Sequence, residues 1–384
     1  MAVFSESELL AIRRHLHQIP ELALKERETH DYLLKKVQEL KQDYLVVKVP
    51  SELPTALLVL VKGSDPQRNI GYRADIDALP VEEDTGLPYK STHPGIMHAC
   101  GHDIHMSVAL GILSYFSENQ PKDNLVFFFQ PAEESESGGM KAYNLGLFTG
   151  DFQVDEFYGL HDKPDLPAGA IGCREGTLFA GTCEVNIEIA GKGGHAAFPQ
   201  KAKDSVVALA SLILQIQTII SRSIDPIESG VITFGKLEAG HIRNVIADHA
   251  RIEGTIRGLT QAMIEKIIDR IKEVCQGVAL SYGVKVTPEF NQGGYWPVEN
   301  NPELTKNFIS YMRDAEDVDY IETAPAMTGE DFGFLLNKIP GTMFWLGVDD
   351  DSSLHSATFT PKEAAIYKGV EAITGFLAYR MAQG

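Results

Sequence analysis

The sequence has few cysteines, a shortage of basic residues and no long apolar run, and each shortage excludes a class of protein. Four cysteines in 384 residues are too few for a disulfide framework, so we expect a reducing, cytoplasmic location. The 34 lysines and arginines are outnumbered by 53 aspartates and glutamates, which gives a net charge of -19. Nucleic acids and anionic membranes need a basic face, so we expect neither as a partner. No apolar run approaches the length that crosses a bilayer.

The hydrophobic content and its pattern predict a helix-covered sheet. Hydrophobic residues make up 44% of the chain, and 384 residues are too many for one ordinary core. Apolar runs at 69–74, 125–129, 157–160 and 342–346 show no alternation, which is typical of strands buried on both faces. We therefore predict an α/β fold with a mostly parallel sheet and helices on both faces.

The order of the predicted elements changes between residues 181 and 291. Here it reads strand, helix, strand, strand, helix, strand, which is the order of the ferredoxin-like α+β fold. We predict that this segment is a separate domain, inserted into a catalytic domain. The catalytic domain would then comprise residues 1–180 and 292–384.

The stretch from Ile96 to His105 contains one cysteine and three histidines, which indicates a metal site. In an extended segment Cys100 and His102 would point to the same side and could bind one ion. Asp103 is the predicted N-cap of a following helix, whose N-terminus would favour the thiolate that binds metal. A buried cysteine is also a common core residue, so the case depends on partners elsewhere in the chain.

Several predicted strands end in residues that can bind metals. In a parallel sheet the carboxyl ends of the strands share one edge, where such folds place their chemistry. The acidic pair follows the run at 125–129, and one histidine follows a later run through an acidic loop. We expect five strand ends to bring together Asp75, Cys100 with His102, Glu133 with Glu134, His161, and His355.

These donors predict two divalent ions, because they are too many for one tetrahedral ion with an open position. A mixture of sulfur, nitrogen and oxygen ligands favours Zn, Co, Mn or Ni. Two such ions polarise a carbonyl and generate hydroxide from bound water. Of Glu133 and Glu134, one would be a ligand and the other a general base, while Asp75 would orient a ligand or act as a cap or turn residue. The predicted ligand set is Cys100, His102, Glu134, His161 and His355.

Five motifs spread over nearly the whole chain resemble the dinuclear-metal amidohydrolase and carboxypeptidase family. The resemblance is to its branch of hippurate hydrolases, auxin-conjugate hydrolases and N-acetyldiaminopimelate deacetylases, and the Cys-Gly-His motif is specific to that branch. The motifs read RADIDALP at 73–80, MHACGHD at 97–103, QPAEE at 130–134, GKGGHAA at 191–197 and MTGEDF at 327–332.

The resemblance implies a role for each of the matching residues. Cys100 would bridge the two ions, and Glu133 would be the general base, although Glu134 is sometimes given that role. His195 and Asn244 would hold the substrate carbonyl and its developing oxyanion, often across the interface of a homodimer formed by the inserted lid domain. The chain departs from the family pattern after Glu134, where a glycine-rich turn is usual, and at Asp162, where an apolar residue is usual.

The expected activity is metal-dependent hydrolysis of the acetyl amide of N-acetyl-LL-2,6-diaminopimelate, in the acetylated branch of lysine biosynthesis. The main alternative is a broader N-acyl-amino-acid amidohydrolase of the aminoacylase or hippurate-hydrolase type. A second alternative makes Cys100 a covalent nucleophile with His102 or His105 as its base. A third is a non-catalytic binding protein, which would need no general base.

Overall fold

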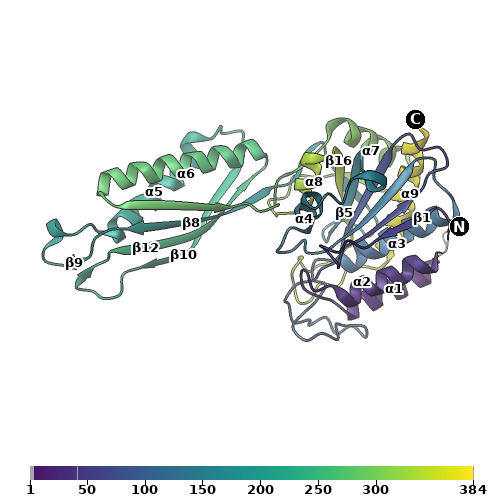
Figure 1. Cartoon of the computed structure of the whole chain (residues 1–384), viewed down its shortest axis with the longest axis horizontal. Helices are drawn as coiled ribbons and strands as arrows, with labels where there is room; N and C mark the ends of the chain where they lie inside the picture. Colours follow the sequence, from purple (N-terminus) through teal and green to yellow (C-terminus); the bar gives the residue numbers. More distant parts are fainter. Residues whose placement is uncertain (1–3, 41, 384) are drawn as a thin grey trace. The chain divides into compact units, whose positions relative to one another are not determined.

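The computed structural model describes residues 4–40 and 42–383 of the chain (Figure 1). The chain divides into two compact units. Unit 1 comprises Met1–Leu178, Val298–Ala324 and Asp331–Gly384, and unit 2 comprises Phe179–Pro297 and Pro325–Glu330.

Unit 1 is built on an eight-stranded sheet with the order β1-β2-β4-β3-β5-β16-β6-β15. Its four central strands run parallel to one another, and their residues are buried almost throughout, as the lack of alternation predicts. These strands are β4 (Asn124–Gln130), β3 (Asn69–Asp75), β5 (Glu156–Lys163) and β16 (Gly341–Gly347). The outer strands are β1 (Leu45–Lys48), β2 (Leu57–Val61), β6 (Ile171–Cys173) and β15 (Tyr320–Glu322), and β7 (Gly176–Phe179) pairs with β14 (Val298–Asn300) in a small separate sheet.

Helices cover this sheet, and one apolar core joins several of them to it. α1 begins with a capping box between Ser5 and Glu8, which satisfies two of its free backbone amides. α1, α3 and α9 pack against one another, and α4 packs against α8. The bounds are α1 (Glu6–Gln18), α2 (Arg27–Glu39), α3 (His102–Glu118), α4 (Gly138–Asn144), α7 (Pro302–Asp314), α8 (Phe332–Lys338) and α9 (Ala364–Ala382), with a short 3-10 turn at Gly150–Phe152.

Unit 2 is a four-stranded antiparallel sheet, order β10-β12-β8-β13, with two helices. Residues of β8 alternate between more and less buried positions, which fits a sheet with one covered face. The predicted α/β fold with a ferredoxin-like α+β portion is thereby confirmed. The elements are β8 (Gly181–Ala190), α5 (Ser205–Ser223), β10 (Gly230–Ala239), β12 (His249–Gly258), α6 (Gln261–Tyr282) and β13 (Lys285–Asn291), with a small pair of β9 (Gly194–His195) and β11 (Val245–Ile246) and a 3-10 turn at Pro199–Lys201.

α5 corrects the expectation that no segment approaches the length of a membrane span. It has 19 residues, 18 consecutive ones reach a mean hydropathy of 1.5, and by length and composition alone it could cross a bilayer. Apolar residues on one side of α5, such as Leu209, Leu212 and Ile216, are buried in the core of unit 2. Packing against the sheet therefore accounts for much of this apolar character.

Candidate metal centre

The predicted ligands lie at the carboxyl end of the central strands and at the start of α3. Glu133 and Glu134 follow β4, His161 lies near the end of β5, and His355 lies in the loop after β16. Cys100 does not follow a strand, which corrects the expectation of five strand ends. It precedes α3, one residue before Gly101, whose φ of 84° lies in the left-handed region. This turn, rather than an extended segment, brings Cys100 and His102 together.

The sulfur of Cys100 is the meeting point of the cluster. Its Sγ lies 3.4 Å from Nε2 of His161 and 3.3 Å from Nε2 of His355, although Cys100 and His355 are 255 residues apart in the chain. Glu134 completes the group, because its Oε1 lies 3.8 Å from Nε2 of both His102 and His355.

Two sets of three donors can be drawn through this cluster, and they share only Cys100. One set is Cys100, His102 and His161, and the other is Cys100, Glu134 and His355; within each set the ligand atoms lie within 4.8 Å of one another. A thiolate common to both sets is the arrangement that two ions bridged by one sulfur would need.

Backbone carbonyls fix the orientation of the two buried histidines. Nδ1 of His102 lies 2.8 Å from the carbonyl oxygen of Asp77, and Nδ1 of His161 lies 2.9 Å from that of Asp162. Since a carbonyl can only accept, Nδ1 carries the proton in both rings and Nε2 presents its lone pair to the cluster. Both imidazoles are therefore in the tautomer that binds a metal through Nε2.

His355 is held in a strained conformation beside Cys100. It is exposed, its φ of 66° is unusual for a residue with a side chain, and its N–H donates to the carbonyl of Ala99 at 2.8 Å. Strain of this kind persists where surrounding contacts impose it, and it is common at functional sites.

The electrostatics of the cluster fit positively charged ions. Nε2 of His102 and Oε1 of Glu134 are buried without a hydrogen-bond partner within the part of the chain that the structure describes. Burial raises the pKa of Glu134 to about 7 and, with Glu134 and Glu133 nearby, raises the pKa of the Cys100 thiol. Burial opposes protonation of His102, but Asp75, Asp77 and Glu134 together outweigh it and raise this pKa to about 10. Divalent cations would take the place of these protons.

The pKa values of the other two histidines favour neutral rings. Burial, with His105 adding to it, lowers the pKa of His161, and burial lowers the pKa of His355. A neutral imidazole is the form that binds a metal.

Asp75 lies beneath the cluster, in a chain of buried charges. Its Oδ2 lies 2.7 Å from the guanidinium of Arg73 and 3.5 Å from Nε2 of His102. Its Oδ1 lies 2.5 Å from Nδ1 of His105. His105 was not assigned to this network from the sequence. Asp75 is therefore neither a helix cap nor a turn residue.

The loop after β4 is held from below by Asp77. The N–H groups of Glu133 and Glu134 each donate to one carboxylate oxygen of Asp77 at 3.0 Å. Glu133 is buried and lies with His102 and Glu134 in a group whose ligand atoms are within 4.8 Å of one another. Sequence reasoning missed this role, for which the second aspartate of the RADIDALP motif was the available signal.

Asp103 does not cap α3, which corrects another expectation. The helix begins at His102 with Gly101 as its N-cap. The buried carboxylate of Asp103 instead forms an ion pair with Nε of Arg13 at 2.9 Å and lies 2.8 Å from Nδ1 of His17. A buried guanidinium competes more strongly for a carboxylate than the backbone amides of a helix start.

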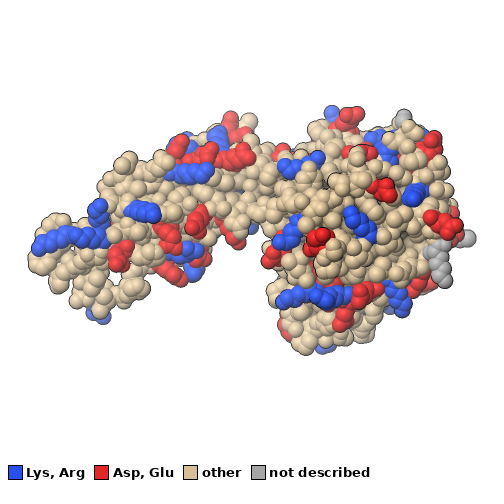
Figure 2. All heavy atoms as spheres, viewed as in Figure 1, with Lys and Arg blue, Asp and Glu red and all other residues tan. Residues whose placement is uncertain are grey.

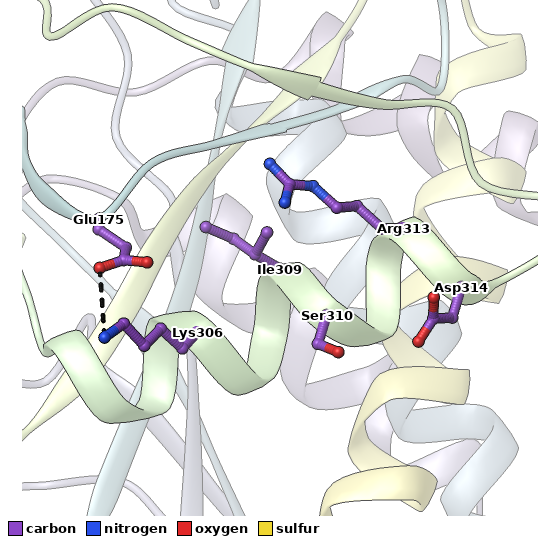
Figure 3. A pocket seen from close by; sticks show the side chains of 6 residues that line it. All are labelled: Glu175, Lys306, Ile309, Ser310, Arg313 and Asp314. Carbon is purple, nitrogen blue, oxygen red and sulfur yellow. Dashed lines mark ion pairs between the residues drawn. The ribbon is translucent and has the colours of Figure 1, made fainter.

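His195 and Asn244 lie together on unit 2 rather than among the ligands of unit 1. Both are exposed, and the backbone N–H of Ala196 donates to the carbonyl of Asn244 at 3.2 Å. A cavity of about 590 Å³ opens beside them, lined by residues that include Arg243 and His241. A smaller pocket on unit 1, about 250 Å³ along α7, contains none of the predicted site residues (Figure 3).

Comparisons with known proteins identify the family of the chain. The chain belongs to peptidase family M20/M25/M40, which its residues 71–379 match. It is 74% identical over 382 residues to N-acetyldiaminopimelate deacetylase of Lactobacillus helveticus, covering 99% of this chain and 100% of that one. It is 71% identical over 379 residues to the protein of the same name from Limosilactobacillus reuteri, with coverage of 99% and 100%. The family and branch expected from the motifs are confirmed.

Solved structures agree with the fold. A dinuclear metal-binding peptidase of the M20 family from Bacillus subtilis is similar with a TM-score of 0.87 at 29% identity, covering 98% of both chains. A tripeptidase from Staphylococcus aureus shares the fold with a TM-score of 0.75 at 18% identity, covering 99% of both chains. Together with the donor groups described above, the family supports a divalent-metal site in unit 1.

Proposed function

We propose that this chain hydrolyses the acetyl amide of N-acetyl-LL-2,6-diaminopimelate, releasing acetate and diaminopimelate. The observation that carries the proposal is the convergence of five metal-competent side chains from distant parts of the chain on one cluster around Cys100. The curated relatives at 74% and 71% identity bear the name of this deacetylase, which supports the choice of substrate.

The ligand roles follow from the two sets of donors. Cys100 would bridge two ions, with His102 and His161 on one side and Glu134 and His355 on the other. Zn, Co, Mn or Ni would suit this mixture of sulfur, nitrogen and oxygen donors. When bound, such ions would polarise the amide carbonyl and lower the pKa of water.

Proton transfer falls to the buried acidic pair. Glu133 would take the proton of the attacking water and pass it to the leaving nitrogen, while the neighbouring Glu134 serves as a ligand. Asp77 holds the ring of His102 through Nδ1, so Asp75, 3.5 Å from Nε2, would act on this ligand through its negative charge. A cysteine nucleophile has less support, because Cys100 belongs to two sets of metal-competent donors rather than to a single thiol–imidazole pair.

The inserted segment 181–291 would serve as a lid and as the interface of a homodimer. His195 and Asn244 lie on exposed backbone of unit 2, where they could reach a bound substrate and support its oxyanion. A cytoplasmic location accords with four cysteines that are all free thiols.

A kinetic comparison tests the substrate. On metal-reconstituted protein we expect kcat/KM for N-acetyl-diaminopimelate to exceed that for hippurate by at least about a hundredfold, because a matched polar pocket discriminates strongly. Equal or reversed values would favour the broader aminoacylase or hippurate hydrolase. Activity without any metal, unaffected by divalent ions, would instead favour the cysteine nucleophile.

Substitution of each glutamate tests the division of roles. Glu133→Ala should reduce kcat by about 10²–10⁴-fold and leave metal content intact, whereas Glu134→Ala should lose metal. Glu136→Ala is the matched control, since Glu136 is exposed on the same loop and pairs with Lys141 at 3.2 Å. Loss of metal on replacing Glu133 would mean that the two roles are exchanged.

A further inference from the structure

The loop that carries the acidic pair is held by two buried carboxylates, and only one of them belongs to a motif. Three consecutive backbone N–H groups of this loop donate to these two carboxylates. Those of Glu133 and Glu134 donate to Asp77, and that of Ala132 donates to Oε1 of Glu26 at 2.9 Å. Glu26 lies 106 residues from Ala132 in the chain, at the start of α2.

The side chain of Glu26 does not serve as the cap that its position suggests. The residue occupies the N-cap of α2 but makes no capping hydrogen bond with its side chain. The carboxyl group is instead fully buried, where the side chain of Thr55 and nearby backbone N–H groups favour its charged form. Within residues 4–40 and 42–383 no ion pair includes Glu26, whereas the buried Asp75 and Asp103 are each paired with an arginine. Such burial is costly unless something else requires it.

The same oxygen of Glu26 holds two strained residues. Leu24 and Ala132 have φ angles of 61° and 59°, in the left-handed region that residues with side chains rarely adopt. Both donate their N–H to Oε1 of Glu26, at 2.9 Å each. The conformation of Ala132 sets the direction in which the chain enters Glu133, so this acceptor is placed to control the loop.

The electrostatic placement of Glu26 is also unfavourable. Burial, and after it the Asp77 carboxylate, raises the pKa of Glu26 to about 7. The cost of burying this carboxyl group is offset by the hydrogen bonds that it accepts from Leu24 and Ala132. The two hydrogen bonds to strained backbone are what an apolar residue could not supply.

We propose that Glu26 is a positioning residue that, through the N–H of Ala132, fixes the loop bearing the general base and the metal ligand. The inference rests on the proposed function of Glu133 and Glu134. A displacement of about 1 Å at a reacting group can reduce a rate by about a hundredfold, so a lost acceptor should be visible in kcat.

Two substitutions separate the acceptor from its volume. Glu26→Leu keeps similar bulk but cannot accept, whereas Glu26→Gln keeps an oxygen for both N–H groups. In the metal-loaded enzyme we expect Glu26→Leu to lower kcat about ten- to a hundredfold with KM within about threefold, and to weaken metal binding about tenfold. The amides of the 131–137 segment should exchange at least about tenfold faster. Glu26→Gln should remain within about threefold of the parent in every assay.

Glu21→Leu is the matched control. Glu21 also lies just before α2 and also accepts a backbone N–H, that of Thr29 at 2.9 Å, but its side-chain hydrogen bonds go to Thr29 and, among the described residues, none reaches the loop at 131–137. We expect its kcat, metal affinity and exchange of that segment to stay within about twofold of the parent. Equal effects of Glu21→Leu and Glu26→Leu would overturn the proposal, as would a Gln variant as impaired as the Leu variant.

The experiment also distinguishes failure of the proposed function. If the parent enzyme does not hydrolyse N-acetyl-diaminopimelate, the substrate assignment fails while the exchange and metal-affinity measurements, which need no substrate, still decide the role of Glu26. If the parent is active and Glu26→Leu changes none of the three quantities, the positioning role alone is wrong.

Discussion

Unit 1 buries several charged side chains inside its core, whereas the charged side chains on the sheet of unit 2 lie near its surface and Glu330 is a buried exception. The side chains of Arg13, Arg73, Asp75 and Asp103 have 0% exposure and form pairs at 2.9 and 2.7 Å. In unit 2 the corresponding groups, such as Arg251 with Glu253 at 2.7 Å, are about one-third exposed at 29% and 33%. Figure 2 shows acidic and basic side chains interspersed over the visible surface of both units.

The apolar cores of the two units also differ in composition. The buried cluster of unit 2 consists of aliphatic residues, methionine and cysteine, packed between α5, α6 and the sheet. Unit 1 adds many buried aromatic rings, such as Phe308 stacked on Phe344 at 4.6 Å. Burying a charged side chain costs free energy unless it is well paired. We therefore expect the buried charges around the candidate metal centre to lower the stability of unit 1, whereas unit 2 carries fewer such groups.

Removal of metal should have the largest effect and should be confined to unit 1. A chelator should reduce activity to background and lower the thermal midpoint of unit 1, because its crowded carboxylates and imidazoles lose the cations that bind only the folded state. Added Zn, Co, Mn or Ni should restore both. Amide exchange resolved by segment measures the two units separately. Faster exchange throughout unit 2 on removal of metal would contradict the expectation that the effect is confined to unit 1.

Breaking a buried ion pair should destabilise unit 1 next most strongly. Asp103→Leu removes the carboxylate 2.9 Å from the buried guanidinium of Arg13 and leaves Glu363 at 3.4 Å, so we expect a loss of about 3 kcal/mol in the free energy of unfolding. The double variant Arg13→Met with Asp103→Leu should recover part of this loss, because the buried guanidinium is removed with its partner while His17 still loses the carboxylate at 2.8 Å.

The two tryptophans make this measurable by unit. Trp345 lies in unit 1 and Trp296 in unit 2, so urea unfolding followed by fluorescence in a Trp296→Phe background reports on unit 1 alone. A loss below about 1 kcal/mol for Asp103→Leu would show that this pair behaves as a surface pair does.

A helix cap in unit 2 should matter less. Asp204 caps α5 by accepting from the N–H groups of Val206 and Val207 at 2.9 and 3.3 Å. Asp204→Ala should therefore cost about 1 kcal/mol, and Asp204→Asn, which keeps the acceptor, only a few tenths. Fluorescence of Trp296 in a Trp345→Phe background measures it, and an Asn variant as unstable as the Ala variant would argue against a capping role.

Much of unit 1 was predictable because its strands carry their own signal. The run Leu125–Phe129 has no alternation, and a parallel sheet places all such strand ends at one edge. The candidates Glu134, His161 and His355 could therefore be grouped before their distances were known. The grouping needs only the order of the elements and the direction of the strands.

What escaped prediction was set by contacts that leave no local pattern. Asp103 has the position of a helix cap, but Arg13 of α1 binds it instead. Cys100 and His102 meet through the left-handed turn at Gly101, where an extended segment was expected. Glu26 acts on backbone amides, and an N–H donor is common to nearly every residue, so no side-chain motif indicates the contact.

The smallest effect is expected from the surface charge network of unit 2. Arg251 pairs with Glu188 on the neighbouring strand β8 and with Glu253 on its own strand β12, in contact with solvent. Water and salt screen such pairs, and holding long side chains in place costs conformational entropy, so Arg251→Gln should shift the thermal midpoint of unit 2 by no more than about 1 °C. Parallel melts at low and high salt check this, because any contribution should fall as salt rises. A shift as large as that of Asp103→Leu would mean that charges at the surface of unit 2 are as tightly coupled as those inside unit 1. The two units would then not differ in the strength of their charge pairs.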